Sequence, residues 1–268
     1  MKRKITLKPV RFDDAASRAP TVTRPVCSRA RALAMDTHVA PHQHAWTQLS
    51  YCTSGLMQVT VAQHGLQTTF IVPPSRAVWI APGVQHTVTV LEAAELRTVD
   101  LHASVSPEGW NTCRVLVVSK LLRELIHALE GSQPGPRDTA LMALTLDEIT
   151  HAATQALGVP MPRDKRLRAL CEAVVRAPGE RATLAEWAID VGASERTVAR
   201  LFRTELATSF QQWCQQAVLA HALPMLARGT PISQVAIASG YRSDSAFSAM
   251  FKSAMGQPPR SFQYKNGP

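Results

Sequence analysis

The sequence predicts a multidomain α+β protein, with a β-rich N-terminal part that leads into helices and an all-α C-terminal domain. Its 268 residues are enough for two domains of ordinary size. From about residue 33 to about residue 101, short alternating apolar runs lie between turns, a pattern typical of strands. From about residue 119 onward the apolar residues recur at helical spacing instead. These three observations define the predicted fold class.

Composition and charge indicate an anionic partner. Hydrophobic residues make up 46% of the chain, which excludes a wholly disordered protein. The net charge is +9 and the sequence pI is about 9.8. Basic residues outnumber acidic ones in residues 1–31 and 163–268, whereas acidic residues dominate between them. Residues 1–31 are therefore predicted to form a basic N-terminal arm, and residues 163–268 a domain suited to nucleic acid.

Cysteine usage and the apolar runs favour a cytoplasmic protein. The cysteines number five and none forms a C-x-x-C pair, so neither a disulfide framework nor a cysteine zinc site is expected. No apolar run approaches about 18 residues, so no membrane span is expected. The basic N-terminus lacks a following apolar segment and does not resemble a secretory signal.

The strands between residues 32 and 106 predict a small antiparallel barrel or sandwich. Met57, Val59 and Val61 alternate with polar or small residues, as in a strand with one buried face. Turn signals such as Ser54-Gly55 recur at intervals of about 8–12 residues, which is the spacing of short strands in such folds.

Residues 107–162 are predicted to contain two helices that connect the domains. The first carries an apolar stripe from Ser119 to Glu130, which is either a dimerisation surface or a face packed on the protein's own barrel. The second is expected from about Asp138 to Leu157. The glycine and prolines of residues 158–162 predict a linker at the domain boundary.

Two similar helix pairs follow the linker. In the first pair, Thr183 and Glu186 have the spacing of a capping box, Gly192 ends the helix, and Ser194 caps the next one. A helix, a glycine-containing turn and a second helix with exposed arginines predict a helix-turn-helix motif.

The second pair repeats this order around Gly240. Ser243 or Asp244 is expected to cap its second helix. Residues 209–227 are long enough for one helix that connects the two pairs, with Pro224 inside it.

Two segments of these pairs carry specific motifs. One runs from Gly192 to Arg203, and the other runs from Ala236 to Lys252 and is followed by Gly256-Gln257-Pro258-Pro259. Both are similar to signature segments of the AraC/XylS family of transcription regulators, over about Asp164 to Gln263. The resemblance implies that two recognition helices enter successive major-groove segments on one face of DNA.

The resemblance assigns DNA contacts position by position. In the first recognition helix, Arg196, Ala199 and Arg200 are the base-facing candidates, because arginine pairs well with guanine O6 and N7. Arg203 lies one turn later and is expected to reach phosphate. The second helix lacks basic residues at the matching positions, so phosphate contacts and helix N-terminal amides are expected there. Its candidates, with two flanking cations, are Arg242, Asp244, Ser245, Ser248, Ala249 and Lys252.

A histidine pattern occurs in the β-rich part. His42-Gln43-His44 is followed by Gln48, and Pro82-Gly83-Val84-Gln85-His86 comes about forty residues later. These segments resemble the two cupin motifs, which implies a cupin-like β-barrel. In cupin enzymes three histidines and a glutamate bind a divalent metal, and here Gln48 stands in place of the glutamate. The possible metal ligands are His42, His44, Gln48 and His86, and imidazoles suit zinc, nickel or iron.

Three interpretations of this cluster remain open: a metal-free sensor pocket, a metal that helps to hold an effector, and a catalytic metal. A catalytic metal would lack the carboxylate and a partner that orients its ligands. The predicted effector-binding residues are His42, His44, Trp46, Gln48, Tyr51, Trp79 and His86.

A cupin-type sensor followed by an AraC-type domain resembles a subgroup of one-component bacterial regulators. The resemblance implies a sequence-specific activator or repressor with no catalytic residues and no required cofactor. Its expected partners are duplex DNA, a small-molecule effector, a second copy of the chain and, for an activator, RNA polymerase. Two alternatives are a metal-dependent cupin enzyme fused to a DNA-binding domain, and a ligand-blind architectural DNA binder with a steep salt dependence.

Overall fold

The computed structural model describes residues 9–10, 19–155, 157–180 and 183–263. The chain divides into two compact units. The first unit contains residues 1–63 and 70–156, and the second contains residues 64–69 and 157–268. Among the described residues, no helix is long and apolar enough to span a membrane.

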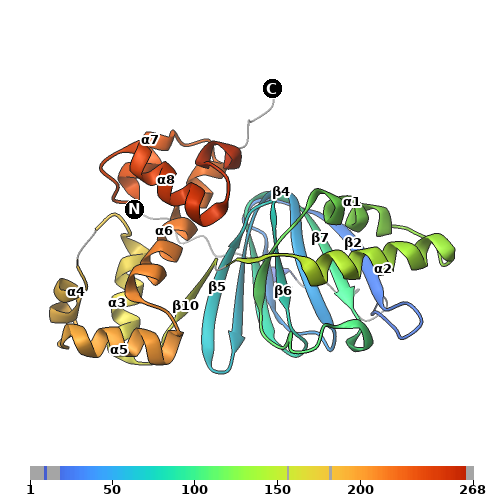
Figure 1. Ribbon diagram of the computed structural model, residues 1–268, viewed down its shortest axis with the longest axis horizontal. Helices are drawn as coiled ribbons and strands as arrows, with labels where there is room; N and C mark the ends of the chain where they lie inside the picture. Colours follow the sequence, from blue (N-terminus) through green and yellow to red (C-terminus); the bar gives the residue numbers. More distant parts are fainter. Residues whose placement is uncertain (1–8, 11–18, 156, 181–182, 264–268) are drawn as a thin grey trace. The chain divides into compact units, whose positions relative to one another are not determined.

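Two long strands organise the first unit (Figure 1). They are β4 (Thr47–Gln63) and β7 (Gln85–Leu101), which pair antiparallel along most of their length. The pairing register shifts between Cys52 and Met57, and such bulges bend a strand. Among the described residues, the other strands of the ten-stranded sheet are β1 (Pro9–Val10), β2 (Val26–Leu33), β3 (His38–His42), β5 (Leu66–Val72), β6 (Arg76–Ile80), β8 (Arg114–Val117), β9 (Thr154–Gln155) and β10 (Gly158–Met161).

The bend divides the pairing of β7 into two parts. Its first half pairs with β3 and its second half with β2. On the other side of β4, the order continues through β6 and β8 to β9. The β-rich, cupin-like prediction is confirmed, but the hydrogen-bonded order of the described strands runs from β1 to β9 without closing. The predicted barrel is therefore an open sheet.

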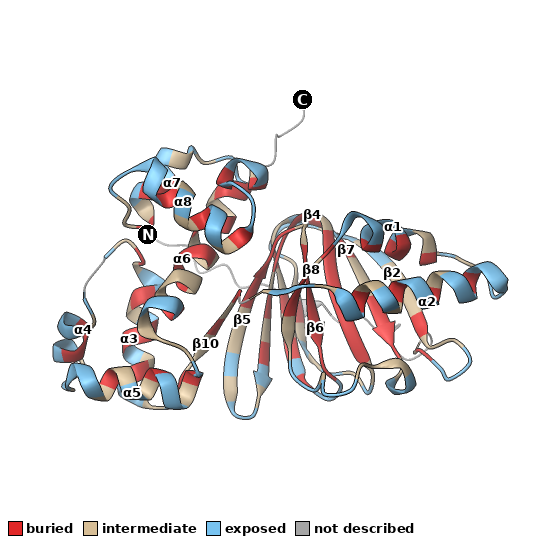
Figure 2. Ribbon diagram, in the orientation of Figure 1, coloured by how far each residue is buried: buried red, intermediate tan, exposed pale blue. Residues whose placement is uncertain are grey.

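Helices α1 (Lys120–Leu129) and α2 (Pro136–His151) pack on this sheet. Ser119 caps α1 by accepting a hydrogen bond from the Leu122 amide. The apolar stripe of α1 is buried in one cluster with sheet residues such as Leu49 and Leu116 (Figure 2). Of the two interpretations of that stripe, the structure shows packing on the protein's own sheet. The helices thus belong to the first unit rather than to a separate linker.

Three predicted boundaries differ from the structure. Strand β2 begins at Val26, so residues 26–31 belong to the sheet and not to an arm, while residues 1–8 and 11–18 lie outside the described residues. Helix α2 ends at His151, six residues before the predicted end. Part of the predicted linker forms β10 (Gly158–Met161), which pairs with β5. Sheet pairing satisfies backbone groups that a linker would leave to water.

The second unit contains the two predicted helix-turn-helix motifs. Helix α3 (Lys165–Arg176) precedes the first motif, formed by α4 (Leu184–Asp190) and α5 (Glu195–Leu206). Helix α6 (Phe210–Ala227) continues through Pro224 and leads to the second motif, formed by α7 (Ile232–Ala238) and α8 (Asp244–Met255). A short 3₁₀ turn at Pro259–Phe262 follows.

Aromatic residues hold this unit together. Trp213 on α6 is completely buried, and its indole N–H donates to the Pro160 carbonyl at 2.8 Å. Phe202 on α5 packs beside Trp213, and Phe247 and Phe251 form the apolar anchors of α8. Large buried rings contribute strongly to core stability, so Phe202 and Trp213 join the first motif to α6, while Phe247 and Phe251 anchor α8 in its own core.

The packing of α1 predicts that a substitution on its buried face lowers protein stability more than a substitution on its exposed face. We expect Ile126→Ala to lower the free energy of unfolding by about 2–5 kcal/mol, because it removes a fully buried side chain from the cluster below α1. Leu121→Ala is the matched control, since that side chain is 51% exposed, and its effect is expected to stay within about 0.5 kcal/mol. Urea denaturation measures both, and equal effects would contradict the packing described.

Candidate functional site

Capping interactions shape the first helix-turn-helix motif. Thr183 accepts a hydrogen bond from the Glu186 amide and the Glu186 carboxylate accepts one from the Thr183 amide, which completes the predicted capping box. Gly192 has a positive φ of 64°, a conformation that glycine adopts without strain. Ser194 then caps α5 by accepting from the Thr197 amide. These interactions set the sharp turn that presents α5.

Helix α5 has one buried and one basic face. Val198, Phe202 and Leu206 are buried in the core of the unit. Arg196, Arg200 and Arg203 are exposed, and the predicted position Ala199 is half-buried. Because residues three or four apart lie on the same side of a helix, the three guanidinium groups share one exposed face.

Helix α8 repeats the geometry with a different surface. Ser243 caps it by accepting from the Ala246 amide, and Gly240 in the preceding turn has a φ of 76°. Phe247, Phe251 and Met255 are its buried residues. The predicted contacts are exposed except for the half-buried Ser248; they are Arg242, Asp244, Ser245, Ala249 and Lys252. Of these, only Arg242 and Lys252 are cationic.

The second candidate site is a cluster of three histidines in the first unit. His42 lies at the end of β3, His44 lies in the loop after it, and His86 lies on β7 directly opposite His42. One potential ligand nitrogen from each ring lies within 4.8 Å of the others. The predicted histidines therefore come together although His86 is far from the other two in the sequence.

Hydrogen bonds orient two of these rings. His42 Nδ1 lies 2.8 Å from the Ala40 carbonyl oxygen, and His86 Nδ1 lies 3.0 Å from that of Val84. A carbonyl oxygen only accepts, so each Nδ1 carries a proton and donates it, and Nε2 is the ring nitrogen left to face another partner. His86 Nε2 is buried and has no hydrogen-bond partner among the described residues.

His44 and His86 are neutral at physiological pH. Burial disfavours the charged imidazolium and lowers the pKa of each ring to about 4. His44 stacks on the Trp46 indole, with ring centroids 5.0 Å apart. The Nε2 atom of His44 and the indole nitrogen of Trp46 are buried without a partner in the described part of the chain. Unpaired buried nitrogens of this kind are suited to a ligand.

Gln48 lies beside His44, as the cupin pattern suggests, and it also bonds to a buried carboxylate. Its amide nitrogen donates to the Asp100 carboxylate at 3.0 Å, and its amide oxygen accepts from the Ser50 hydroxyl at 3.3 Å. The Arg29 guanidinium forms an ion pair with the same carboxylate. Gln48 is thus tied to a buried ion pair.

Two family models match the chain. An AraC-like ligand binding domain matches residues 25–186, and a helix-turn-helix domain matches residues 187–265. The chain is 35% identical to the HTH-type transcriptional regulator NimR of Escherichia coli over 222 residues, covering 81% of this chain and 80% of NimR.

The chain belongs to the AraC family of transcription regulators. It is a DNA-binding regulator with a ligand-binding domain.

Two further similarities are weaker. Over 103 residues the regulator is 30% identical to the HTH-type transcriptional regulator RipA of Corynebacterium glutamicum, covering 38% of this chain and 31% of RipA. A crystal structure of ToxT from Vibrio cholerae aligns with 89% of this chain and 96% of that chain, at a TM-score of 0.37 and 12% identity. At that level the structural likeness carries no argument about ligand or mechanism.

Two of the predicted effector contacts do not join the histidines of this AraC-family regulator. Tyr51 and Trp79 pack in the apolar cluster below α1 and α2, and the Trp79 indole N–H donates to the Trp110 carbonyl at 3.2 Å. Strand side chains alternate between two faces. Gln48 and Tyr51 are three positions apart on β4, so they point to opposite faces of the sheet.

Sequence reasoning missed Arg29 and Asp100. They lie 71 residues apart, on β2 and β7, and the pairing that joins them is not visible in the sequence. The one available signal was Asp100 itself, a charge next to the apolar Val99 and Leu101 at the end of a predicted strand.

The buried ion pair predicts that the stability of this regulator depends strongly on both Arg29 and Asp100. We expect Asp100→Asn to destabilise the protein by about 3–5 kcal/mol, because it leaves the Arg29 cation buried without a counter-charge. The double variant Arg29→Met with Asp100→Asn should recover most of that loss, since no charge remains buried. Urea denaturation of the single and double variants tests this, and a double variant that is no more stable than Asp100→Asn would contradict it.

Proposed function

We propose that this regulator reads DNA sequence mainly through α5, with α8 as a weaker reader that binds mostly phosphates. The observation that carries the proposal is the exposed face of α5, where Arg196 and Arg200 lie one turn apart and opposite the buried Phe202. An arginine in the major groove donates two hydrogen bonds to guanine O6 and N7, so this spacing suits two base contacts.

The remaining contacts position the protein on the duplex. Arg203 lies one turn after Arg200 and is within reach of the phosphate backbone in this proposal. Arg242, in the turn before α8, and Lys252 on α8 supply charge, and the exposed residues Asp244 and Ser245 begin the helix. Backbone amides at a helix N-terminus bind phosphate without reading sequence.

We also propose that the effector is a small molecule that contacts His42, His44, Trp46 and His86. The supporting observation is the set of buried nitrogens without partners on His44, Trp46 and His86. Such a ligand regulates transcription only by favouring one arrangement of the two units over another, since equal affinity for both would shift nothing.

A divalent metal is the second candidate for this cluster. The donor set fits, because His42 and His86 hold their Nδ1 protons toward backbone carbonyls and direct lone pairs elsewhere. His42, His44 and His86 would hold zinc, nickel or iron, while the Gln48 amide oxygen, its one metal-binding atom, accepts from the Ser50 hydroxyl. When bound, the metal would supply a Lewis-acidic point for an effector with a donor atom.

A regulator without catalytic activity is the function that we favour over a cupin enzyme. The matching families and the named relatives are regulators, and the position of the cupin glutamate is taken by Gln48. Contact with RNA polymerase, for an activator, and a homodimer are further proposed partners. Since the inner stripe of α1 is buried, a second copy would have to use another surface, such as the exposed Leu121 and Leu144.

Base reading by α5 predicts that truncating one of its arginine side chains lowers the selectivity for specific over unrelated DNA. A duplex selected from a random library by the wild-type protein provides the specific DNA. We expect Arg200→Ala to weaken binding to it by about 1–3 kcal/mol while binding to unrelated DNA changes little. Arg137→Ala, an exposed arginine on α2, is the control and should bind as the wild type does. Fluorescence anisotropy measures both affinities, and an unchanged ratio of specific to non-specific binding would refute the assignment.

The metal proposal predicts a stoichiometry. Elemental analysis of the purified, tag-free protein should find about one zinc, nickel or iron per chain, since three imidazoles converge on one point. His44→Ala should lose that metal, whereas His151→Ala on the exposed end of α2 should keep it. A wild-type protein without metal, after incubation with each ion, would leave the cluster as a polar effector pocket.

A further inference from the structure

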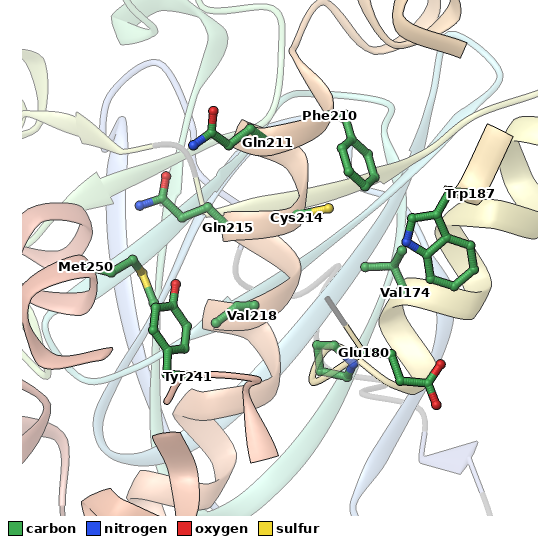
Figure 3. Close-up of a pocket in the computed structure, with 11 residues that line it drawn as sticks. Val174, Glu180, Trp187, Phe210, Gln211, Cys214, Gln215, Val218, Tyr241 and Met250 are labelled. Carbon is green, nitrogen blue, oxygen red and sulfur yellow. The ribbon is translucent and has the colours of Figure 1, made fainter. Parts of the chain in front are cut away.

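A cavity lies in the second unit between the two helix-turn-helix motifs (Figure 3). Its volume is about 390 Å³. The wall comes from three parts of the unit: the C-terminal end of α3 with the loop after it and α4, the first half of α6, and Tyr241 and Met250 of the second motif. Ligand pockets for small molecules begin at about 300 Å³, so the cavity is large enough for a compact ligand.

The loop after α3 meets the end of α7, in the second motif, at the edge of this cavity. A Cβ atom on Gly179 would lie 2.8 Å from the Ala238 carbonyl oxygen, closer than real Cβ contacts. Only glycine allows the loop after α3 to approach the end of α7 so closely. Its neighbours Pro178 and Glu180 both line the cavity. A movement of one motif against the other would therefore change the shape of the cavity.

The lining is aromatic with one charge. Trp187, Phe210 and Tyr241 contribute rings, and Gln211 and Gln215 contribute amides. Glu180 is the one charged residue among the described residues that form the wall, and no Lys, Arg or His is among them. In Figure 3 the side chains of Trp187 and Glu180 lie on one side of the cavity, across from those of α6. Aromatic faces and a carboxylate both attract a cation.

We propose that this cavity is a second small-molecule site, which takes a compact aromatic ammonium compound and couples its binding to DNA affinity. The ammonium group pairs with Glu180, and the ring lies among Trp187, Phe210 and Tyr241. The ligand touches both motifs, and both recognition helices must engage one DNA duplex together. A ligand that prefers one spacing of the motifs therefore changes DNA affinity, and DNA changes ligand affinity by the same factor.

Three probes with one ring system and different charges test the ligand class. Isothermal titration calorimetry on the full chain compares tryptamine, which is cationic, with indole and indole-3-acetate, which are neutral and anionic. We expect tryptamine to bind one per chain and at least tenfold more tightly than either analogue. Equal affinity for the three probes, or binding of none, would overturn the proposal.

Variants locate the site. Glu180→Gln should weaken tryptamine binding at least fivefold, whereas Glu172→Gln, an exposed carboxylate on α3 that does not line the cavity, should leave it unchanged. Gln215→Trp should abolish binding by filling the cavity, and its unfolding temperature shows whether the protein remains folded. Wild-type affinity in Glu180→Gln, or in a folded Gln215→Trp protein, would place the probe elsewhere and overturn the proposal.

The coupling is measured on DNA. Saturating tryptamine should change the Kd for the selected duplex at least threefold in the wild-type protein. The same concentration should have no such effect on Glu180→Gln, which controls for a general effect of the cation on DNA. An unchanged Kd in the wild type, with the ligand bound, would refute the coupling. This inference rests on the family's DNA-binding function and does not depend on the histidine cluster.

Discussion

A buried carboxylate, that of Asp100, requires partners from several strands in the interior of the first unit. Asp100 is completely buried, and removing a charge from water costs several kcal/mol unless a partner offsets it. Arg29 supplies the opposite charge and Gln48 donates a hydrogen bond, so β2, β4 and β7 are joined at one point. Gln48, the residue that the cupin pattern offers as a fourth metal ligand, is part of this network. Burial keeps the neighbouring His44 and His86 imidazoles neutral, and their buried Nε2 atoms have no hydrogen-bond partner among the described residues.

The second unit holds two similar helix-turn-helix motifs, which are connected by helix α6. Each motif uses a serine cap, a glycine turn and buried phenylalanines, so the backbone geometry repeats while the exposed faces differ. The exposed face of α5 carries three arginines, whereas Arg242 and Lys252 are the only cations among the predicted contacts at α8. Helix α6 connects the motifs, and the aromatic cavity beside it is lined by residues of both motifs.

Sequence patterns were reliable where one segment carried all the necessary interactions. The caps at Thr183 and Ser194 depend on atoms within three residues and form as predicted, and of the two candidates for α8, Ser243 and Asp244, the cap is Ser243. Patterns were less informative where the partner was remote. The stripe on α1 shows that the helix has a buried face, but an apolar face fits a second copy as well as the protein's own sheet. Tyr51 and Trp79 were grouped with the histidines for their chemistry, although strand alternation places Tyr51 and Gln48 on opposite faces.

The sequence by itself determined the family, the two-part architecture, the positions of the recognition helices and the identity of the three histidines. Those features follow from local spacing, which the chain carries in consecutive residues. Only the tertiary structure decided that the sheet stays open, that Gln48 serves a buried ion pair, and that α1 buries its stripe internally. It also showed the cavity between the two motifs, formed by residues from Val174 to Met250. The physical reason is that strand pairing and helix packing join residues far apart in the chain, and no local pattern specifies those partners.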